Sequence, residues 1–112
     1  MDSKDLRARL HSILLGHAGK ARAITGRELS TLVGHHDDRR IRQVIRELIK
    51  SGLPVASSTE FPAGYFLVTT RQEAEEYAAS IRSRLIEDAL RRRDFRRAAD
   101  THLTPAIQGR LV

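Results

Sequence analysis

The chain has 112 residues, enough for one domain with or without an appendage, and a formal net charge of +6 from 20 Lys and Arg against 14 Asp and Glu. Two Tyr and three Phe are the only aromatic residues, so the core has to be built from Leu, Ile, Val and Ala, which favours helices. Cys is absent, which excludes disulfides and thiolate chemistry, and no apolar run approaches the roughly 20 residues of a membrane span. Since no signal-peptide pattern is visible either, the protein is expected to be cytoplasmic.

The first predicted element is a helix over residues 5–16, ended by a glycine at 16 or 19. Its apolar side chains at helical spacing are Leu6, Leu10, Ile13 and Leu14. The segment over residues 23–25 is long enough only for a turn or for a single rung of a β-ladder, that is, one isolated β-bridge. Thr25-Gly26-Arg27-Glu28 is then a Ser/Thr-x-x-Glu capping box, which predicts a short helix that ends at Gly34.

Residues 37–50 carry the clearest helical periodicity. One buried stripe is predicted from Ile41, Val44, Ile45, Leu48 and Ile49. Asp37 is a suitable N-cap, and Asp38 suits the positive end of the helix dipole. Ser51-Gly52 ends this helix.

Two short strands are predicted next, over residues 53–58 and 65–68, joined by a loop that holds a Pro and a Gly. Thr70-Arg71-Gln72-Glu73 is a second capping box and opens a long helix that reaches about Ala98. The predicted fold is mainly α with a small β-hairpin, an α+β class. It is divided into a domain over residues 1–69, the long helix over 70–99 and a tail over 100–112.

The stretch from residue 24 to residue 68 carries a recognisable pattern. Residues 41–48 read Ile-Arg-Gln-Val-Ile-Arg-Glu-Leu, and residues 52–55 follow as Gly-Leu-Pro-Val. With the preceding rung and short helix, this stretch resembles the winged helix-turn-helix of biotin-repressor-type regulators and of bacteriophage-encoded DNA-binding proteins. The resemblance implies that the first helix of the turn crosses the DNA backbone and that the second, over residues 37–50, lies in the major groove.

Side-chain roles follow from that resemblance and from the buried stripe. Base contacts are expected from Arg39, Arg42, Gln43 and Arg46, since Arg pairs with guanine and Gln with adenine. Phosphate contacts are expected from Lys20, Arg27, Arg40, Lys50, Ser58 and Thr59. The alternative is a solvated helix face, and a GC-rich genome would also explain why most of the cations are Arg.

The predicted wing departs from wings that contact DNA, which carry Arg or Lys. Residues 59–64 hold no cation and one acid, Glu60. Either the hydroxyls and amides of residues 57–59 touch phosphate, or the wing does not touch DNA. The aromatic ring of Phe61 is expected to fold back on the core, with a contact to a partner as the alternative.

The long helix is longer than one small domain needs, and winged helices with such extensions often dimerise through them. The residues expected to form a homodimer contact are Ile81, Leu85, Ile86, Ala89 and Leu90. The alternative is a helix packed wholly on its own domain. Residues 91–97 hold five Arg and one Phe, which could grip phosphates or form a solvated helix end.

No metal site is expected, because His35 and His36 are adjacent and the other His are scattered. Neither a cofactor, a small-molecule ligand nor a catalytic constellation is indicated. The sequence therefore predicts a non-enzymatic, sequence-specific duplex DNA-binding protein, either a transcriptional regulator or a phage replication-initiation factor. The alternative is a winged-helix module that docks other proteins in replication or phage assembly.

Overall fold

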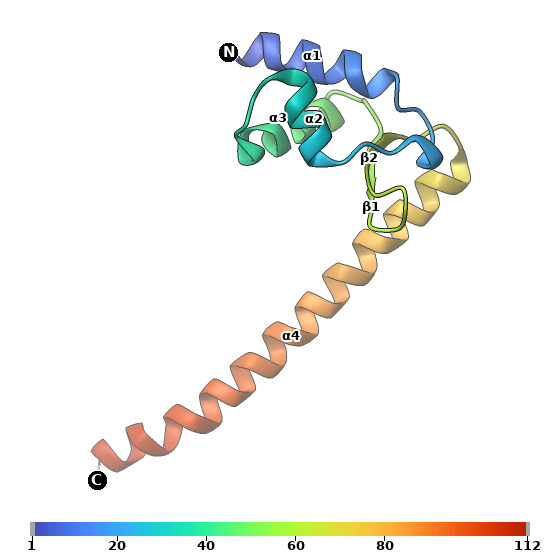
Figure 1. Cartoon of the computed structure of the whole chain (residues 1–112). Helices are drawn as coiled ribbons and strands as arrows, with labels where there is room; N and C mark the ends of the chain where they lie inside the picture. Colours follow the sequence, from blue (N-terminus) through green and yellow to red (C-terminus); the bar gives the residue numbers. More distant parts are fainter. Residues whose placement is uncertain (1, 112) are drawn as a thin grey trace. The chain divides into compact units, whose positions relative to one another are not determined.

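A computed structural model describes the backbone of residues 2–111 and the side chains of residues 2–103 (Figure 1). The elements in chain order are α1 (Ser3–Leu15), the 3-10 helix η1 (Lys20–Arg22), α2 (Gly26–Val33), α3 (Asp38–Lys50), β1 (Val55–Ser58), β2 (Gly64–Leu67) and α4 (Arg71–Leu111). The predicted α+β class is confirmed: the chain is mainly helical, with one small antiparallel hairpin and a long C-terminal helix. Residues 1–77 and residues 78–112 form separate compact units.

The boundaries of α2 and α3 are set by local caps, as predicted. Thr25 Oγ1 accepts a hydrogen bond from the Glu28 backbone N–H at 3.1 Å, and the Glu28 carboxylate accepts one from the Thr25 N–H at 3.4 Å. Gly34 ends α2 in the left-handed region, with φ 70°. At the start of α3, the carboxylate of Asp37 accepts from the Arg40 N–H at 3.2 Å. All of these features depend on neighbouring residues only, which is why the sequence pattern could reveal them.

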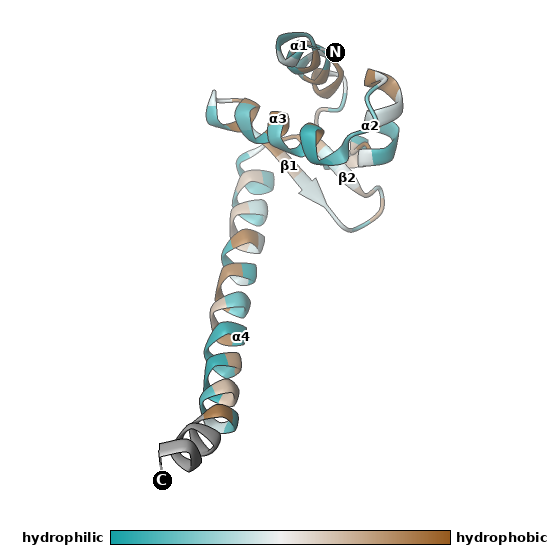
Figure 2. Ribbon diagram, turned by 90° about the vertical axis from the view of Figure 1, so that its left-hand side faces the viewer, coloured by the Kyte–Doolittle hydropathy of each residue, from teal (hydrophilic) through white to brown (hydrophobic). Residues whose placement is uncertain are grey.

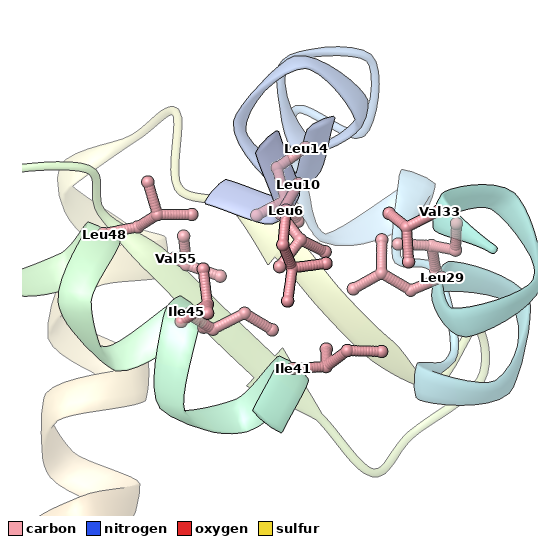
Figure 3. Close-up of a cluster of buried hydrophobic side chains, with 11 residues drawn as sticks. Leu6, Leu10, Leu14, Leu29, Val33, Ile41, Ile45, Leu48 and Val55 are labelled. Atoms are coloured by element: carbon pink, nitrogen blue, oxygen red, sulfur yellow. The ribbon is translucent and has the colours of Figure 1, made fainter. Parts of the chain in front are cut away.

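One apolar core lies within the first unit. Figure 3 shows the leucines of α1 reaching between side chains of α2 and α3. The buried cluster consists of Leu6, Leu10, Leu14, Ile24, Leu29, Val33, Ile41, Val44, Ile45, Leu48 and Val55. Ile49, predicted to belong to the buried stripe, is instead 43% exposed. It lies about 90° around α3 from the centre of the stripe, at the edge of the buried side.

The hairpin is joined to the rest of the unit by a third, very short segment. β1 and β2 pair antiparallel, with Val55 opposite Leu67 and Ser58 opposite Gly64. The single rung predicted near residue 24 is confirmed, because Ile24 and Tyr65 exchange two backbone hydrogen bonds of 2.8 and 2.7 Å. These bonds hold the loop end of the hairpin against the segment that leads into α2.

Glu73 ties the start of α4 to η1, which the predicted capping box did not anticipate. Thr70 Oγ1 accepts from the Glu73 N–H at 3.1 Å, as a capping box requires. The shortest hydrogen bonds of the Glu73 carboxylate, however, come from outside the capping box. The carboxylate accepts from the backbone N–H groups of Thr69 and Lys20, both at 2.9 Å. A residue at the beginning of the last helix thus holds a segment 53 positions earlier in the chain.

The end predicted for α4 is wrong. Rather than stopping near Ala98, the helix continues through Pro105 to Leu111, so the predicted tail is helical as far as the structure describes it. A proline removes one backbone hydrogen bond and strains the preceding turn, but it can be carried inside a helix.

The carboxylate of Glu73 makes the stability of the fold depend on pH. Backbone hydrogen bonds from Lys20 and Thr69 hold the pKa of Glu73 below its ordinary value. Since the folded pKa is the lower one, this stabilisation is full above the unfolded value of about 4.3 and is lost as the pH falls through the folded value. We expect Glu73→Gln to flatten the decline of Tm between about pH 5 and about pH 3.

The matched control is Glu75→Gln on the exposed side of the same helix turn. It should keep the wild-type slope of Tm against pH in that range. A Glu73→Gln slope as steep as that of Glu75→Gln would show that the two backbone bonds contribute nothing to acid sensitivity.

Candidate nucleic-acid interface

The solvent side of α3 carries a row of basic side chains. The buried residues of α3 occupy one side of the helix, and an arc of about 100° on the opposite side holds exposed polar residues. We call them the basic face: Arg39, Arg42, Gln43, Arg46 and Lys50. Figure 2 shows α3 as a mostly hydrophilic ribbon. The four side chains predicted to contact bases all lie on this face.

Most of these cations have no partner in the part of the chain whose side chains are described. Among residues 2–103, the side chains of Arg39, Arg46 and Lys50 make no hydrogen bond or ion pair, and no ion pair involves any residue of α3. Gln43 accepts a long hydrogen bond, 3.5 Å, from the guanidinium of Arg40. The donors of the three cations are therefore open to an anionic partner from outside.

A shallow hollow of about 520 Å³ adjoins the basic face and brings three elements together. It is lined by Gly26, Arg27, Ser30, Thr31, His36, Asp38, Ile41, Arg42 and Tyr65. Arg27 of α2, predicted to contact phosphate, thus lines the same hollow as Arg42 of α3. Burial raises the pKa of the Tyr65 hydroxyl, an effect that the charge of Arg42 opposes. The start of α2, the middle of α3 and strand β2 consequently share one cationic surface.

Three of the residues predicted to contact phosphate already have partners within the protein. The Lys20 ammonium lies 3.3 Å from a carboxylate oxygen of Glu60. Arg40 is half-buried and donates to Ser3 at the start of α1. The Ser58 hydroxyl accepts from the Glu60 N–H at 3.1 Å. The partners of Lys20 and Arg40 lie 40 and 37 positions away in the sequence, so no local pattern could reveal them, and the three phosphate contacts stay predictions.

The other three predicted phosphate contacts remain available. Arg27, Lys50 and Thr59 are exposed, and within residues 2–103 their side chains have no hydrogen-bond or ion-pair partner. Arg27 and Lys50 therefore extend the cationic surface beyond α3 itself and toward the C-terminal end of that helix.

No family model, curated protein or solved structure matches this chain. The chemistry of the basic face therefore has to be taken from its own residues. Among the described residues, no group of three or more His, Asp or Glu is placed to hold a metal ion. None of the described helices is long and apolar enough to cross a membrane.

The position of Phe61 is where the sequence prediction failed most clearly. Its side chain is 99% exposed, so the prediction that it folds back on the core is wrong. The residues beside it are the ones that are held, because Glu60 pairs with Lys20 and Pro62 is half-buried. Between them, the phenyl ring is left at the tip of the loop that joins β1 and β2.

In the second unit, α4 leaves its large apolar side chains in solvent. The exposed fractions are 39% for Ile81, 64% for Leu85, 50% for Ile86 and 44% for Leu90. Ile81, Leu85 and Ala89 share one side of the helix, whereas Ile86 and Leu90 lie about 100° farther round. The five residues therefore do not form one narrow stripe, and the homodimer contact stays a prediction.

The arginine-rich run over residues 91–97 is only partly neutralised. Arg91 lies 3.6 Å from Asp88, and Arg93 lies 3.1 Å from Asp94, both as exposed ion pairs. Exposed pairs of this kind contribute little and are easily exchanged for another anion. Both interpretations of this run, a contact with phosphates and a solvated helix end, are compatible with its geometry and stay predictions.

Proposed function

We propose that this protein binds duplex DNA as a winged helix-turn-helix, with α3 in the major groove and α2 against the sugar–phosphate backbone. The observation that supports this is the basic face: its cations lie opposite the buried stripe that anchors α3 in the core. An α-helix with its side chains is about 10–12 Å wide, which suits the roughly 12 Å width of the major groove. A rigidly anchored helix can present such side chains to base edges with little loss of conformational freedom.

The proposal divides the surface by chemistry. Arg39, Arg42 and Arg46 are assigned to guanine edges and Gln43 to adenine, because these pairings are bidentate and each discriminates by about 1–3 kcal/mol. Phosphate contacts are assigned to Lys50 at the C-terminal end of the basic face, to Arg27 beside it, and to the other residues of α2 that line the hollow. Lys20, Arg40 and Ser58 already have partners within the protein and are left out of this set.

The biological role that fits such a surface is that of a non-enzymatic, cytoplasmic DNA-binding protein. A transcriptional regulator would recognise a site that overlaps a promoter, whereas a phage replication-initiation factor would recognise repeated sites at an origin. In either role, a homodimer formed through α4 would present two recognition helices to the DNA. A docking module for other proteins is the second candidate, and the cation-free hairpin loop with its exposed Phe61 is the observation that favours it.

The test is equilibrium binding to a pool of random duplexes, followed by fluorescence anisotropy over a series of salt concentrations. We expect wild type to bind at low salt with a steep dependence of log K on log [salt], and Arg42→Ala/Arg46→Ala to bind at least about tenfold more weakly. Its slope should also become shallower, by about 0.9 for each phosphate that the variant no longer neutralises.

A control must remove the same charge from elsewhere on the first unit. Lys4→Ala/Arg7→Ala does so on α1, whose side chains are exposed on the other side of the core from the basic face. It should retain most of the wild-type affinity. Equal losses of affinity in the two double variants would mean that net charge alone is responsible, and an absence of binding by wild type at low salt would contradict the DNA proposal and favour protein docking.

A further inference from the structure

The side chain of Phe61 is the most exposed of the large apolar side chains among the described residues. At 99% exposure it buries almost nothing, although water strongly disfavours an exposed aromatic ring. Phe66, on the adjoining strand, is buried at 3% exposure. Removal of the Phe61 ring would therefore cost the fold nothing, and its chemistry is free to serve a partner.

The loop that carries this ring is held in place before any partner arrives. Gly64 packs so tightly that an added Cβ would lie 2.0 Å from the carbonyl oxygen of Ile24. Tyr65 bonds twice to the same Ile24, and an exposed ion pair between Lys20 and Glu60 adds a weaker link from the loop to η1. Because these contacts already restrict the loop, little conformational entropy is lost when it binds a partner. Such preorganisation raises affinity.

The charge at the tip matches an apolar contact rather than a grip on phosphate. Glu60 is the only charged residue in the loop, and its carboxylate is paired with Lys20 at 3.3 Å. The loop therefore offers no cation to a phosphate, while the acid that DNA would repel has Lys20 as a cationic neighbour. What remains at the surface is a phenyl ring followed by a proline.

The hairpin lies beside the basic face. Tyr65 of β2 and Arg42 of α3 line the same hollow, and α3 also contacts β1; in Figure 2 the hairpin lies below α3, at an angle to it. In B-DNA the groove next to the major groove, across one strand of the backbone, is the minor groove. An element that flanks a helix seated in the major groove is therefore placed to reach the minor groove.

We propose that Phe61 acts as an apolar wedge in the minor groove, entering between base pairs and partly unstacking them. Phe and Pro are among the side chains that architectural proteins use in this way. The inference rests on the proposed DNA binding by α3 and adds a second contact of different chemistry. In this arrangement the loop contacts the apolar faces of the bases and not the phosphates, so it needs no cation.

The experiment compares wild type, Phe61→Ala and Phe61→Leu on random duplexes that carry 2-aminopurine in place of several adenines. Binding is followed by anisotropy, and unstacking by the rise in 2-aminopurine fluorescence. For Phe61→Ala we expect about a tenfold weaker affinity, within the range that aromatic–base stacking contributes, and little fluorescence rise. Phe61→Leu keeps an apolar wedge and should fall between the two. Because no charge is removed, all three proteins should share one salt slope.

The outcomes separate this inference from the proposed function. If Phe61→Ala binds as tightly as wild type and gives the same fluorescence rise, the wedge is wrong while DNA binding by α3 stands, and the ring is then free for a protein partner. If wild type does not bind DNA at low salt, both proposals fall. An unchanged Tm of Phe61→Ala, expected from its 99% exposure, ensures that any weaker binding does not come from a damaged fold.

Discussion

Gly64→Ala is expected to destabilise the protein by roughly 2–5 kcal/mol, from left-handed backbone strain and steric overlap together. Gly64 has φ 121°, a conformation that side chains rarely adopt. An added Cβ would lie 2.0 Å from the carbonyl oxygen and 2.4 Å from the carbonyl carbon of Ile24. Both neighbours are backbone atoms, so the clash can be relieved only by separating the hairpin from the segment that leads into α2.

Gly52→Ala is the matched control for this substitution. Its φ is 111°, close to that of Gly64, but an added Cβ there would meet nothing within 4 Å. It should cost only the backbone contribution, about 1–2 kcal/mol. Urea unfolding followed by circular dichroism measures both free energies. Equal losses of stability in the two variants would show that the hairpin can move away from Ile24 without penalty.

Leu14→Ala is expected to cost about 2.7–5 kcal/mol, the range measured for leucines that leave a cavity in a packed core. Leu14 is fully buried, and it lies with Leu6 and Leu10 on the side of α1 that faces α2 and α3. Truncation removes its packing within this core, and the remaining aliphatic side chains cannot fill the space without leaving their rotamers.

The adjacent leucine provides the comparison. Leu15 is on the same helix but is 56% exposed, so Leu15→Ala should change the free energy of unfolding by no more than about 0.5 kcal/mol. Thermal or urea unfolding of the two variants, under one set of conditions, measures both changes in the free energy of unfolding. A destabilisation by Leu15→Ala as large as that by Leu14→Ala would contradict the burial assigned to α1.

Much of the candidate site could be predicted because its signals are local. A capping box spans four residues, and a helix of 3.6 residues per turn shows its buried stripe directly in the sequence. Thr25, Glu28 and Asp37 therefore indicated the correct boundaries for α2 and α3. Once the stripe through Ile41 was recognised, the basic face followed as its opposite side. Ile49 shows the limit of this reasoning, since periodicity does not reveal where the core ends.

The identity of the elements and the side of α3 that faces solvent can thus be inferred from the sequence alone, because both depend on contacts within a few residues. Which polar groups remain free depends on the tertiary fold. Lys20 meets Glu60 across 40 positions, and its N–H meets Glu73 across 53. The close approach of Gly64 to Ile24 also joins residues that are far apart in the sequence. Such pairs have no period and no fixed spacing, so no local pattern predicts them. The 99% exposure of Phe61 is likewise a property of the tertiary fold, since it depends on which distant residues pack against the loop.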